Sequence, residues 1–302
     1  MSSRETDSLP AFELCETWDD DRLRGSFPLP APDANKYSRG VLVVIAGRKR
    51  YPGAACLASR AGQLMGAGYT QLITEKPVGR IAVAAYPSLV AREIGTFDAA
   101  ELSQLKPNAS KAVCIGPGFE TGAKRNRKVL ASVLEQAACP VLVDGGALAN
   151  LCSREVRSAL QARQWVGRTT VITPHMGEAR RLGKDLGIAC EDAAQLSTAI
   201  SKATGSVTAL KGPDTFIAGN GLIYAMCEGS AALAKAGTGD VLAGMIASLL
   251  AQGTPAFEAA VLGCSLHARA GELAAQELGI VSVTPESVLD HLPRAITNLV
   301  GR

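Results

Sequence analysis

Residues 236–244, AGTGDVLAG, combine three glycines with a threonine and an aspartate directly before an apolar, helix-forming run. If a helix begins here, its first backbone N–H groups lack intrahelical partners and can converge on one anion. We therefore predict an anion hole at Gly237, Thr238 and Gly239. An acid in the first turn of a helix is ordinary, but beside such a hole the carboxylate of Asp240 could accept a proton while the amides stabilise a transferring phosphoryl group. The motif favours phosphoryl transfer.

The familiar nucleotide-binding motifs are absent from the sequence. It contains no G-x-x-x-x-G-K-[S/T] loop and no well-placed G-x-G-x-x-G after a strand. A nucleotide site in this chain would therefore be of another kind.

Short apolar runs that alternate with helical segments must position this motif. Such alternation predicts a mainly parallel sheet with helices on both faces, a three-layer α/β/α fold. Two strand-like runs around Gly219-Asn-Gly221 predict a hairpin appended to the sheet at 215–225. Helices are expected at 238–252, 255–278 and 285–300, and the strands at 41–47, 70–74, 112–116, 140–146, 169–174 and 206–212.

Ligands in open α/β sheets bind beyond the carboxyl ends of the strands. The segments that follow the predicted strands contain glycine, proline or polar residues, and together they favour one shared cleft. His175 has two interpretations here: it could contact a ligand, or it could start a helix together with Glu178, three positions on. The strand-end segments are 47–55, 116–118, 144–146, 173–175 and 211–215.

Composition excludes some classes of partner. The 302 residues carry a net charge of +3 and only 4% aromatic residues, so we expect neither nucleic acid nor a membrane surface as partner. The densest basic run, 124–128, is expected to be a solvated helix face. Eight scattered cysteines without a C-x-x-C pair indicate reduced thiols and a cytoplasmic protein. Residues 1–36 are expected to be a partly disordered extension that precedes a single domain at 37–302.

Five collinear motifs, from about residue 40 to the C-terminus, resemble a known family. They are YPGAACLASRAGQLMGAG, GPGF, TPHMGE, LKGPDT and AGTGDVLAGMIASLLAQG. They are similar to the carbohydrate-kinase-like NAD(P)H-hydrate dehydratases of the ribokinase-like superfamily. The resemblance implies nucleotide-dependent dehydration of (6S)-NADHX or NADPHX, with Mg²⁺ and with ADP or ATP as phosphoryl donor; with ADP, the products would include AMP and phosphate.

The resemblance also implies roles for single residues. Asp240 would be the catalytic group at the reactive ring, and Ala55, Gly118 and His175 would contact the hydrated dinucleotide. The adenine nucleotide would lie against Lys211, Gly212, Pro213, Asp214, Thr215 and Gly239. No protein metal ligand is expected. Relatives suggest a homotetramer, and a separate NAD(P)HX epimerase would act with this chain, because 36 residues are too few to hold the epimerase domain that some relatives carry.

Two departures and two alternatives accompany this resemblance. Glu228-Gly-Ser230 stands where the family often has T-G-N, and Asp144-Gly-Gly146 replaces the commoner D-A-D or D-A-G. A small-molecule kinase of the superfamily, of the hydroxymethylpyrimidine or hydroxyethylthiazole type, would use the same anion hole and carboxylate. A nucleotide sensor without catalysis would not need Asp240.

Overall fold

The computed structural model describes residues 15, 16 and 18–301. Within this described part, nine strands form one sheet in the order β3-β2-β1-β4-β5-β6-β7-β8-β9. The strands are β1 (Val41–Ile45), β2 (Tyr69–Thr74), β3 (Val90–Glu93), β4 (Lys111–Ile115), β5 (Val141–Val143), β6 (Thr170–Ile172), β7 (Val207–Leu210), β8 (Thr215–Gly219) and β9 (Leu222–Met226).

Neighbouring strands from β3 to β7 pair in parallel, whereas β8 and β9 form an antiparallel hairpin at one end of the sheet. The hairpin turns at Asn220 and Gly221, which both have positive φ angles, of 54° and 82°. This backbone is typical of a two-residue hairpin turn. The mainly parallel sheet and its appended hairpin are therefore confirmed.

Strand β1 shows why the continuous apolar runs become central strands. All five of its residues are buried, and successive side chains of a strand point to opposite faces. Leu42 and Val44 belong to one hydrophobic core, and Val43 and Ile45 belong to the other. A strand covered on both faces needs apolar residues at every position.

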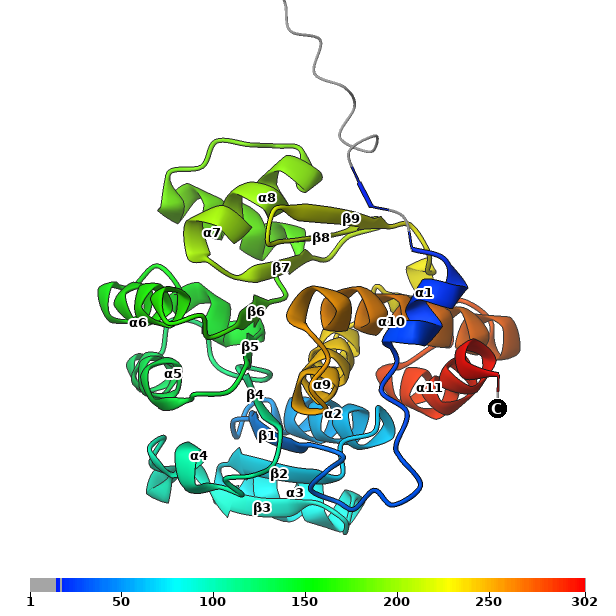
Figure 1. The fold of residues 1–302 in the computed structure, drawn as a ribbon, viewed down its shortest axis with the longest axis horizontal. Helices are drawn as coiled ribbons and strands as arrows, with labels where there is room; N and C mark the ends of the chain where they lie inside the picture. Colours follow the sequence, from blue (N-terminus) through cyan, green and yellow to red (C-terminus); the bar gives the residue numbers. More distant parts are fainter. Residues whose placement is uncertain (1–14, 17, 302) are drawn as a thin grey trace, which may run out of the picture.

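Helices cover both faces and give three layers (Figure 1). One core contains residues of α1 (Asp20–Ser26), α2 (Pro52–Leu64), α3 (Lys76–Ala85), α9 (Thr238–Ala251), α10 (Ala256–Leu278) and α11 (Pro285–Val300). The other contains residues of α4 (Glu101–Gln104), α5 (Lys124–Gln136), α6 (Arg154–Trp165), α7 (Met176–Leu186) and α8 (Ala193–Thr204). Short 3₁₀ turns lie at η2 (Ile94–Thr96), η3 (Gly145–Asn150) and η4 (Ala231–Leu233).

Helices α2 and α9 approach each other closely because small residues line their contact. A Cβ atom built on Gly244 would lie 2.1 Å from the carbonyl oxygen of Ala58, and one on Gly62 would lie 2.2 Å from the Leu42 side chain. The Ser248 hydroxyl donates to the carbonyl of Gly62 at 2.8 Å. This close packing fixes α9 along α2.

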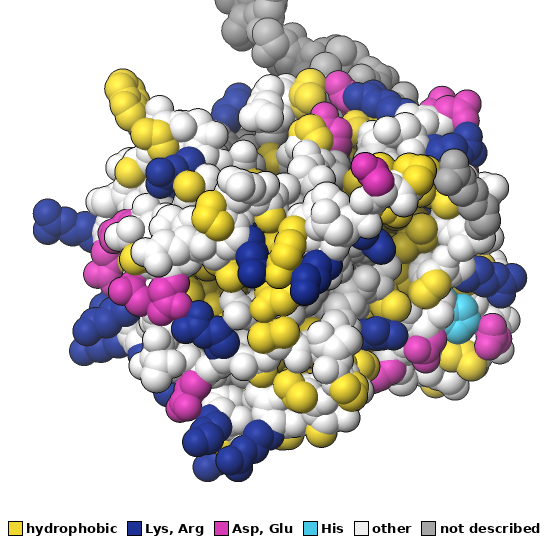
Figure 2. Space-filling model, turned by 60° about the horizontal axis from the view of Figure 1, so that its bottom comes forward, with side chains coloured by type: hydrophobic (Ala, Val, Ile, Leu, Met, Phe, Trp, Pro, Cys, Tyr) yellow, Lys and Arg dark blue, Asp and Glu magenta, His cyan; other side chains and the backbone are white. Residues whose placement is uncertain are grey.

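The sequence interpretation missed β3. Its residues are exposed or half-buried and include Arg92 and Glu93, so this edge strand has no continuous apolar run. Among the described residues, no helix is long and apolar enough to cross a membrane. On the face shown in Figure 2, basic side chains are separated by acidic, polar and hydrophobic ones.

The expected extension at 1–36 is described only in part, because residues 1–14 and 17 lie outside the described residues. Its described residues include helix α1, whose Leu23 is 1% exposed and belongs to the core that contains α10 and α11. Asp19 caps this helix by accepting a hydrogen bond from the N–H of Arg22 at 2.9 Å.

Candidate active site

The ends of β6 and β7 bring two predicted residues together. His175 and Lys211 form an isolated parallel bridge just beyond these strands, and the N–H of Lys211 donates to the carbonyl of Pro174 at 2.8 Å. The backbone pairing therefore extends past the regular sheet, and the two side chains begin at the same edge.

Lys211 is held by a buried carboxylate at the end of β5. Its Nζ donates to Oδ1 of Asp144 at 2.9 Å, and the hydroxyl of Thr173 donates to the same oxygen at 2.6 Å. Burial alone would lower the pKa of Lys211, but the charge and the hydrogen bond of Asp144 outweigh it and raise that pKa. Lys211 therefore keeps its positive charge at the sheet edge.

The first turn of helix α9 lies next to the ammonium group of Lys211. Gly237, its N-cap, has φ of 100° and offers no side-chain cap, so the first N–H groups lack intrahelical partners. A Cβ on Gly237 would lie 2.8 Å from the Pro285 ring and 2.9 Å from Leu57, so only glycine fits here. The Cβ position of Gly239 lies 3.2 Å from Nζ of Lys211. An anion at these amides would therefore also meet an ammonium group.

The side chain of Thr238 has a structural task at the helix start. Its Oγ1 lies 2.8 Å from the carbonyl oxygens of both Leu233 and Lys235. The hydroxyl therefore donates into the turn that contains η4. The backbone N–H of Thr238, which belongs to the predicted anion hole, donates to the carbonyl of Lys235 at 3.4 Å.

Asp240 is half-buried in the first turn of α9. Burial, and next the charge of Asp144, raise the pKa of this carboxyl from 3.8 to about 7, while Lys211 acts in the opposite direction. A carboxyl group with a pKa near neutrality accepts a proton far better than an ordinary aspartate does. The sequence alone gave no sign of this.

His175 turns out to start a helix, as one of its two interpretations had it. Its Nδ1 accepts hydrogen bonds from the N–H groups of Gly177 and Glu178 at 3.0 and 3.3 Å. Oε2 of Glu178 in turn accepts the N–H of His175 at 2.9 Å, which completes a capping box for α7. The ring is nevertheless exposed at the cavity edge, where its Nε2 lies 3.5 Å from Oε2 of Glu178.

A cavity of about 750 Å³ opens beyond the ends of β6 and β7. Its other walls come from the β8–β9 hairpin, from η4, from the start of α9 and from the middle of α10. This volume suits a nucleotide-sized ligand. Several predicted site residues line it together: His175, Lys211, Gly212, Pro213, Thr215, Gly237, Thr238 and Gly239.

Sequence interpretation missed most of the cavity wall that α10 and β9 supply. Met226, Cys264 and His267 line it, beside Glu228 of the Glu228-Gly-Ser230 departure. Burial, and next the charge of Lys211, lower the pKa of His267 to about 4, so this ring is neutral at physiological pH. Cys264 and His267 lie inside the long apolar helix α10, and nothing in their spacing marks them as cavity residues.

The other predicted substrate contacts lie on the neighbouring strand ends. Ala55 is fully buried near the start of α2. Gly118 follows β4 with φ of 68°, and a Cβ there would lie 2.8 Å from both the Ala54 side chain and the Tyr51 carbonyl oxygen. The structure thus packs Gly118 onto the start of α2, beside α9, but neither Ala55 nor Gly118 lines the large cavity, and Asp214 and Asp240 also lie outside its lining.

Comparison with known proteins identifies relatives along almost the whole chain. A family model for NAD(P)H-hydrate dehydratase matches residues 42–294. An ADP-dependent (S)-NAD(P)H-hydrate dehydratase of Xanthomonas campestris pv. campestris is 35% identical over 282 residues, which cover 88% of this chain and 94% of that protein. A bifunctional NAD(P)H-hydrate repair enzyme Nnr of Thermofilum pendens is 32% identical over 286 residues; these cover 90% of this chain but 53% of the relative.

A solved structure agrees with these sequence matches. The ADP/ATP-dependent NAD(P)H-hydrate dehydratase of Bacillus subtilis, co-crystallised with ATP/Mg²⁺, superposes with a TM-score of 0.79 at 28% identity, covering 93% of this chain and 98% of that one. Solved ribokinase-like proteins share the fold. The predicted ribokinase-like α/β fold and the family resemblance are therefore confirmed, and the chain belongs to the NAD(P)H-hydrate dehydratase family.

Proposed function

We propose that this protein catalyses the nucleotide-dependent dehydration of (6S)-NADHX and NADPHX to NADH and NADPH, with ADP giving AMP and phosphate. One observation carries the proposal: a half-buried carboxyl group, Asp240, with its pKa raised to about 7, directly follows a glycine-rich helix start that faces Lys211. Proton acceptor and anion site are adjacent, as transfer of a phosphoryl group to a hydroxyl requires.

The helix start stabilises the phosphoryl group in this proposal. The amides of the Gly237–Thr238–Gly239 turn point at the terminal phosphoryl group, and Lys211 adds its positive charge from the side. Asp144 holds that ammonium in place at 2.9 Å. Because donors and charge are fixed before the reaction, they favour the more negative transition state without reorganising. The rest of the adenine nucleotide lies along Lys211, Gly212, Pro213, Asp214 and Thr215.

Asp240 takes the proton from the C6 hydroxyl of the hydrated nicotinamide ring. The hydroxyl oxygen attacks the terminal phosphorus of ADP, the bond between that phosphorus and the bridging oxygen breaks, and AMP leaves. The phosphate ester at C6 then departs as phosphate while the neighbouring ring carbon loses a proton, which restores the dihydropyridine. Phosphorylation thus converts a poor leaving group into a good one. Ala55, Gly118 and His175 are the proposed contacts to the dinucleotide.

Mg²⁺ is the proposed metal, carried by the nucleotide. Among the described residues, no group of three His, Cys, Asp or Glu side chains converges in a way that could hold a metal ion. Magnesium is often bound mainly by phosphate oxygens and water, with few protein ligands, so this chain fits a metal that enters with ADP or ATP. Bound there, it would neutralise charge on the phosphates.

The test of this function is recovery of absorbance at 340 nm, the NADH band, from purified protein with NADHX, Mg²⁺ and either ADP or ATP. We expect recovery, with ADP as the better donor. A kinase of the same superfamily would instead phosphorylate a thiamin precursor and leave NADHX unchanged. A nucleotide sensor would do neither.

Three further properties belong to the proposal. Fusion of two activities in bifunctional relatives supports a separate NAD(P)HX epimerase as functional partner of this chain. Scattered cysteines without disulfide spacing support a cytoplasmic location. A homotetramer is proposed from the family resemblance, and light scattering of the purified protein tests it.

A further inference from the structure

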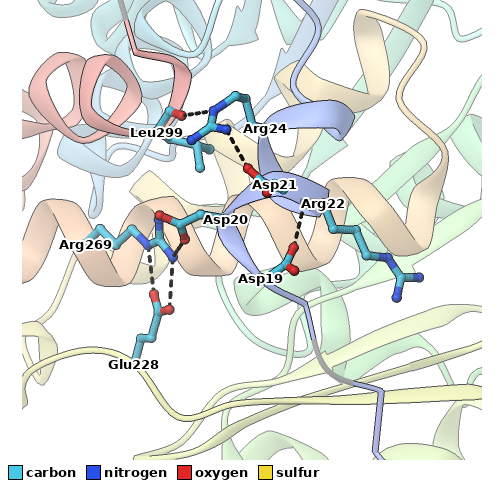
Figure 3. Close-up of polar contacts among 8 residues, drawn as sticks. All are labelled: Asp19, Asp20, Asp21, Arg22, Arg24, Glu228, Arg269 and Leu299. Carbon is cyan, nitrogen blue, oxygen red and sulfur yellow. Dashed lines mark hydrogen bonds and ion pairs between the residues drawn. The ribbon is translucent and has the colours of Figure 1, made fainter.

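Glu228 occupies the cavity wall in a fixed position. It follows β9, and among the described residues that line the cavity it is the only one with a carboxylate. Arg269 of α10 donates two hydrogen bonds to the Glu228 carboxylate, from Nε to Oε2 at 2.9 Å and from Nη2 to Oε1 at 3.0 Å. The same Nη2 also donates to Oδ1 of Asp20 on α1 at 2.7 Å. Figure 3 shows Arg269 between the two carboxylates.

The segment that carries Asp20 is itself attached to the rest of the fold. The N–H of Glu16 donates to the carbonyl of Ile223 in β9 at 2.7 Å, and the rings of Trp18 and Tyr224 meet edge to face at 6.2 Å. Arg24 donates to the last turn of α11 at 2.8 Å. Glu16, Trp18, Asp20 and Arg24 therefore connect this segment to β9, α10 and α11 beside the cavity.

The cavity lining carries charges of both signs. Lys211, Lys235 and the glycine-rich start of α9 attract phosphates, whereas Glu228 is negatively charged. A carboxylate repels phosphates but accepts hydrogen bonds readily from hydroxyl groups. An adenine nucleotide offers such a pair of donors in the adjacent hydroxyls of its ribose, besides the N6 amino group of its base. Arg269 offsets the negative charge of Glu228, so this wall does not oppose binding of a polyphosphate.

We propose that Glu228 recognises the ribose hydroxyls of the adenine nucleotide, and that Arg269 and Asp20 are positioning residues that hold it there. This inference rests on the proposed nucleotide-dependent function and adds a specificity residue to it. It also assigns a task to the Glu228-Gly-Ser230 departure from the family pattern, and it makes the N-terminal helix α1 a part of the nucleotide site.

Bonds around the wall support the fixed geometry. The hydrogen bonds from Arg269 to Glu228, together with Asp20, raise the pKa of the guanidinium and keep it charged. The next residue, Gly229, donates its N–H to Oε1 of Glu272 on α10 at 3.0 Å. Both the side chain of Glu228 and the backbone that follows it are thus anchored to α10.

The test measures binding of ADP and of 2′,3′-dideoxy-ADP by isothermal titration calorimetry on the full-length protein. We expect the wild type to bind ADP about tenfold more tightly, the lower end for hydrogen bonds to a half-exposed charged group. Glu228→Ala should bring the ratio of the two dissociation constants close to one, whereas Arg269→Gln should lower it about threefold and Asp20→Asn about twofold.

Asp21→Asn is the matched control. Asp21 neighbours Asp20 on α1 but pairs with Arg24, on the side away from Glu228 (Figure 3), so the ratio should stay at its wild-type value. A wild type that binds the two nucleotides equally, or a ratio that survives Glu228→Ala, overturns the inference while NADHX dehydration still stands. A protein that binds no ADP at all contradicts both proposals.

Discussion

The raised pKa of Asp240 predicts that its ionisation destabilises the folded protein. In the unfolded chain this carboxyl ionises near 3.8, whereas in the fold its pKa is about 7. The folded state therefore loses stability as pH rises through this window, and above it the whole cost applies. At about 1.4 kcal/mol per pH unit, the difference corresponds to about 4 kcal/mol. Asp240→Asn removes the ionisable group and with it this cost.

The variant should therefore become more stable than the wild type as pH rises. From pH 5 to pH 8 its advantage should grow by about 3 kcal/mol, which corresponds to roughly 5 °C in Tm for a chain of this size. Thermal melting followed by circular dichroism at both pH values measures it. Asp290→Asn, at an exposed position of α11, is the control and should show no such growth. An advantage of Asp240→Asn that stays constant or shrinks toward pH 8 would refute the reasoning.

Substitutions at three other positions test the site. Lys211→Met leaves the buried Asp144 without its ion-pair partner, so we expect a loss of about 3 kcal/mol in unfolding free energy and a higher KM for ADP. If both values stay at their wild-type level, the Lys211–Asp144 ion pair does not stabilise the site. His175→Asn keeps an N-cap for α7 and His175→Ala does not, so only the alanine variant should lose about 1 kcal/mol of unfolding free energy. Both variants should raise KM for NADPHX in the 340 nm assay. Gly118→Ala puts a side chain at a position with φ of 68°, 2.8 Å from the Ala54 side chain. It should lower the unfolding free energy by about 2 kcal/mol, measured by denaturant titration, and weaken NADPHX binding.

The central strands could be predicted because burial on both faces leaves a signal at every position. In β1 and β4, each alternate residue enters one of the two cores, so the sequence shows an unbroken apolar run. The edge strand β3 has solvent on part of its surface and carries Arg92 and Glu93. Its pairing depends on the neighbouring β2 rather than on its own residues, and local pattern does not report that.

The helix start at Gly237 could be predicted because its chemistry is local: glycines, a first-turn acid and an apolar run lie within nine residues. The residues that hold the side chains of this site in place are far apart in the sequence. Lys211 meets Asp144 across 67 positions of the chain, and Arg269 meets Asp20 across 249. The raised pKa of Asp240 depends on burial and on the charge of Asp144. Both depend on the three-dimensional fold, so the sequence could not predict this pKa.

The central claim is that Asp240 accepts the proton while the start of α9 holds the phosphoryl group. The most direct measurement compares turnover of NADPHX at 340 nm by Asp240→Asn and the wild type, with the dissociation constant of ADP determined for both. We expect turnover to fall by about 10² or more, as loss of a general base implies, with ADP binding within a few fold of the wild type. Turnover equal to that of the wild type would contradict the account.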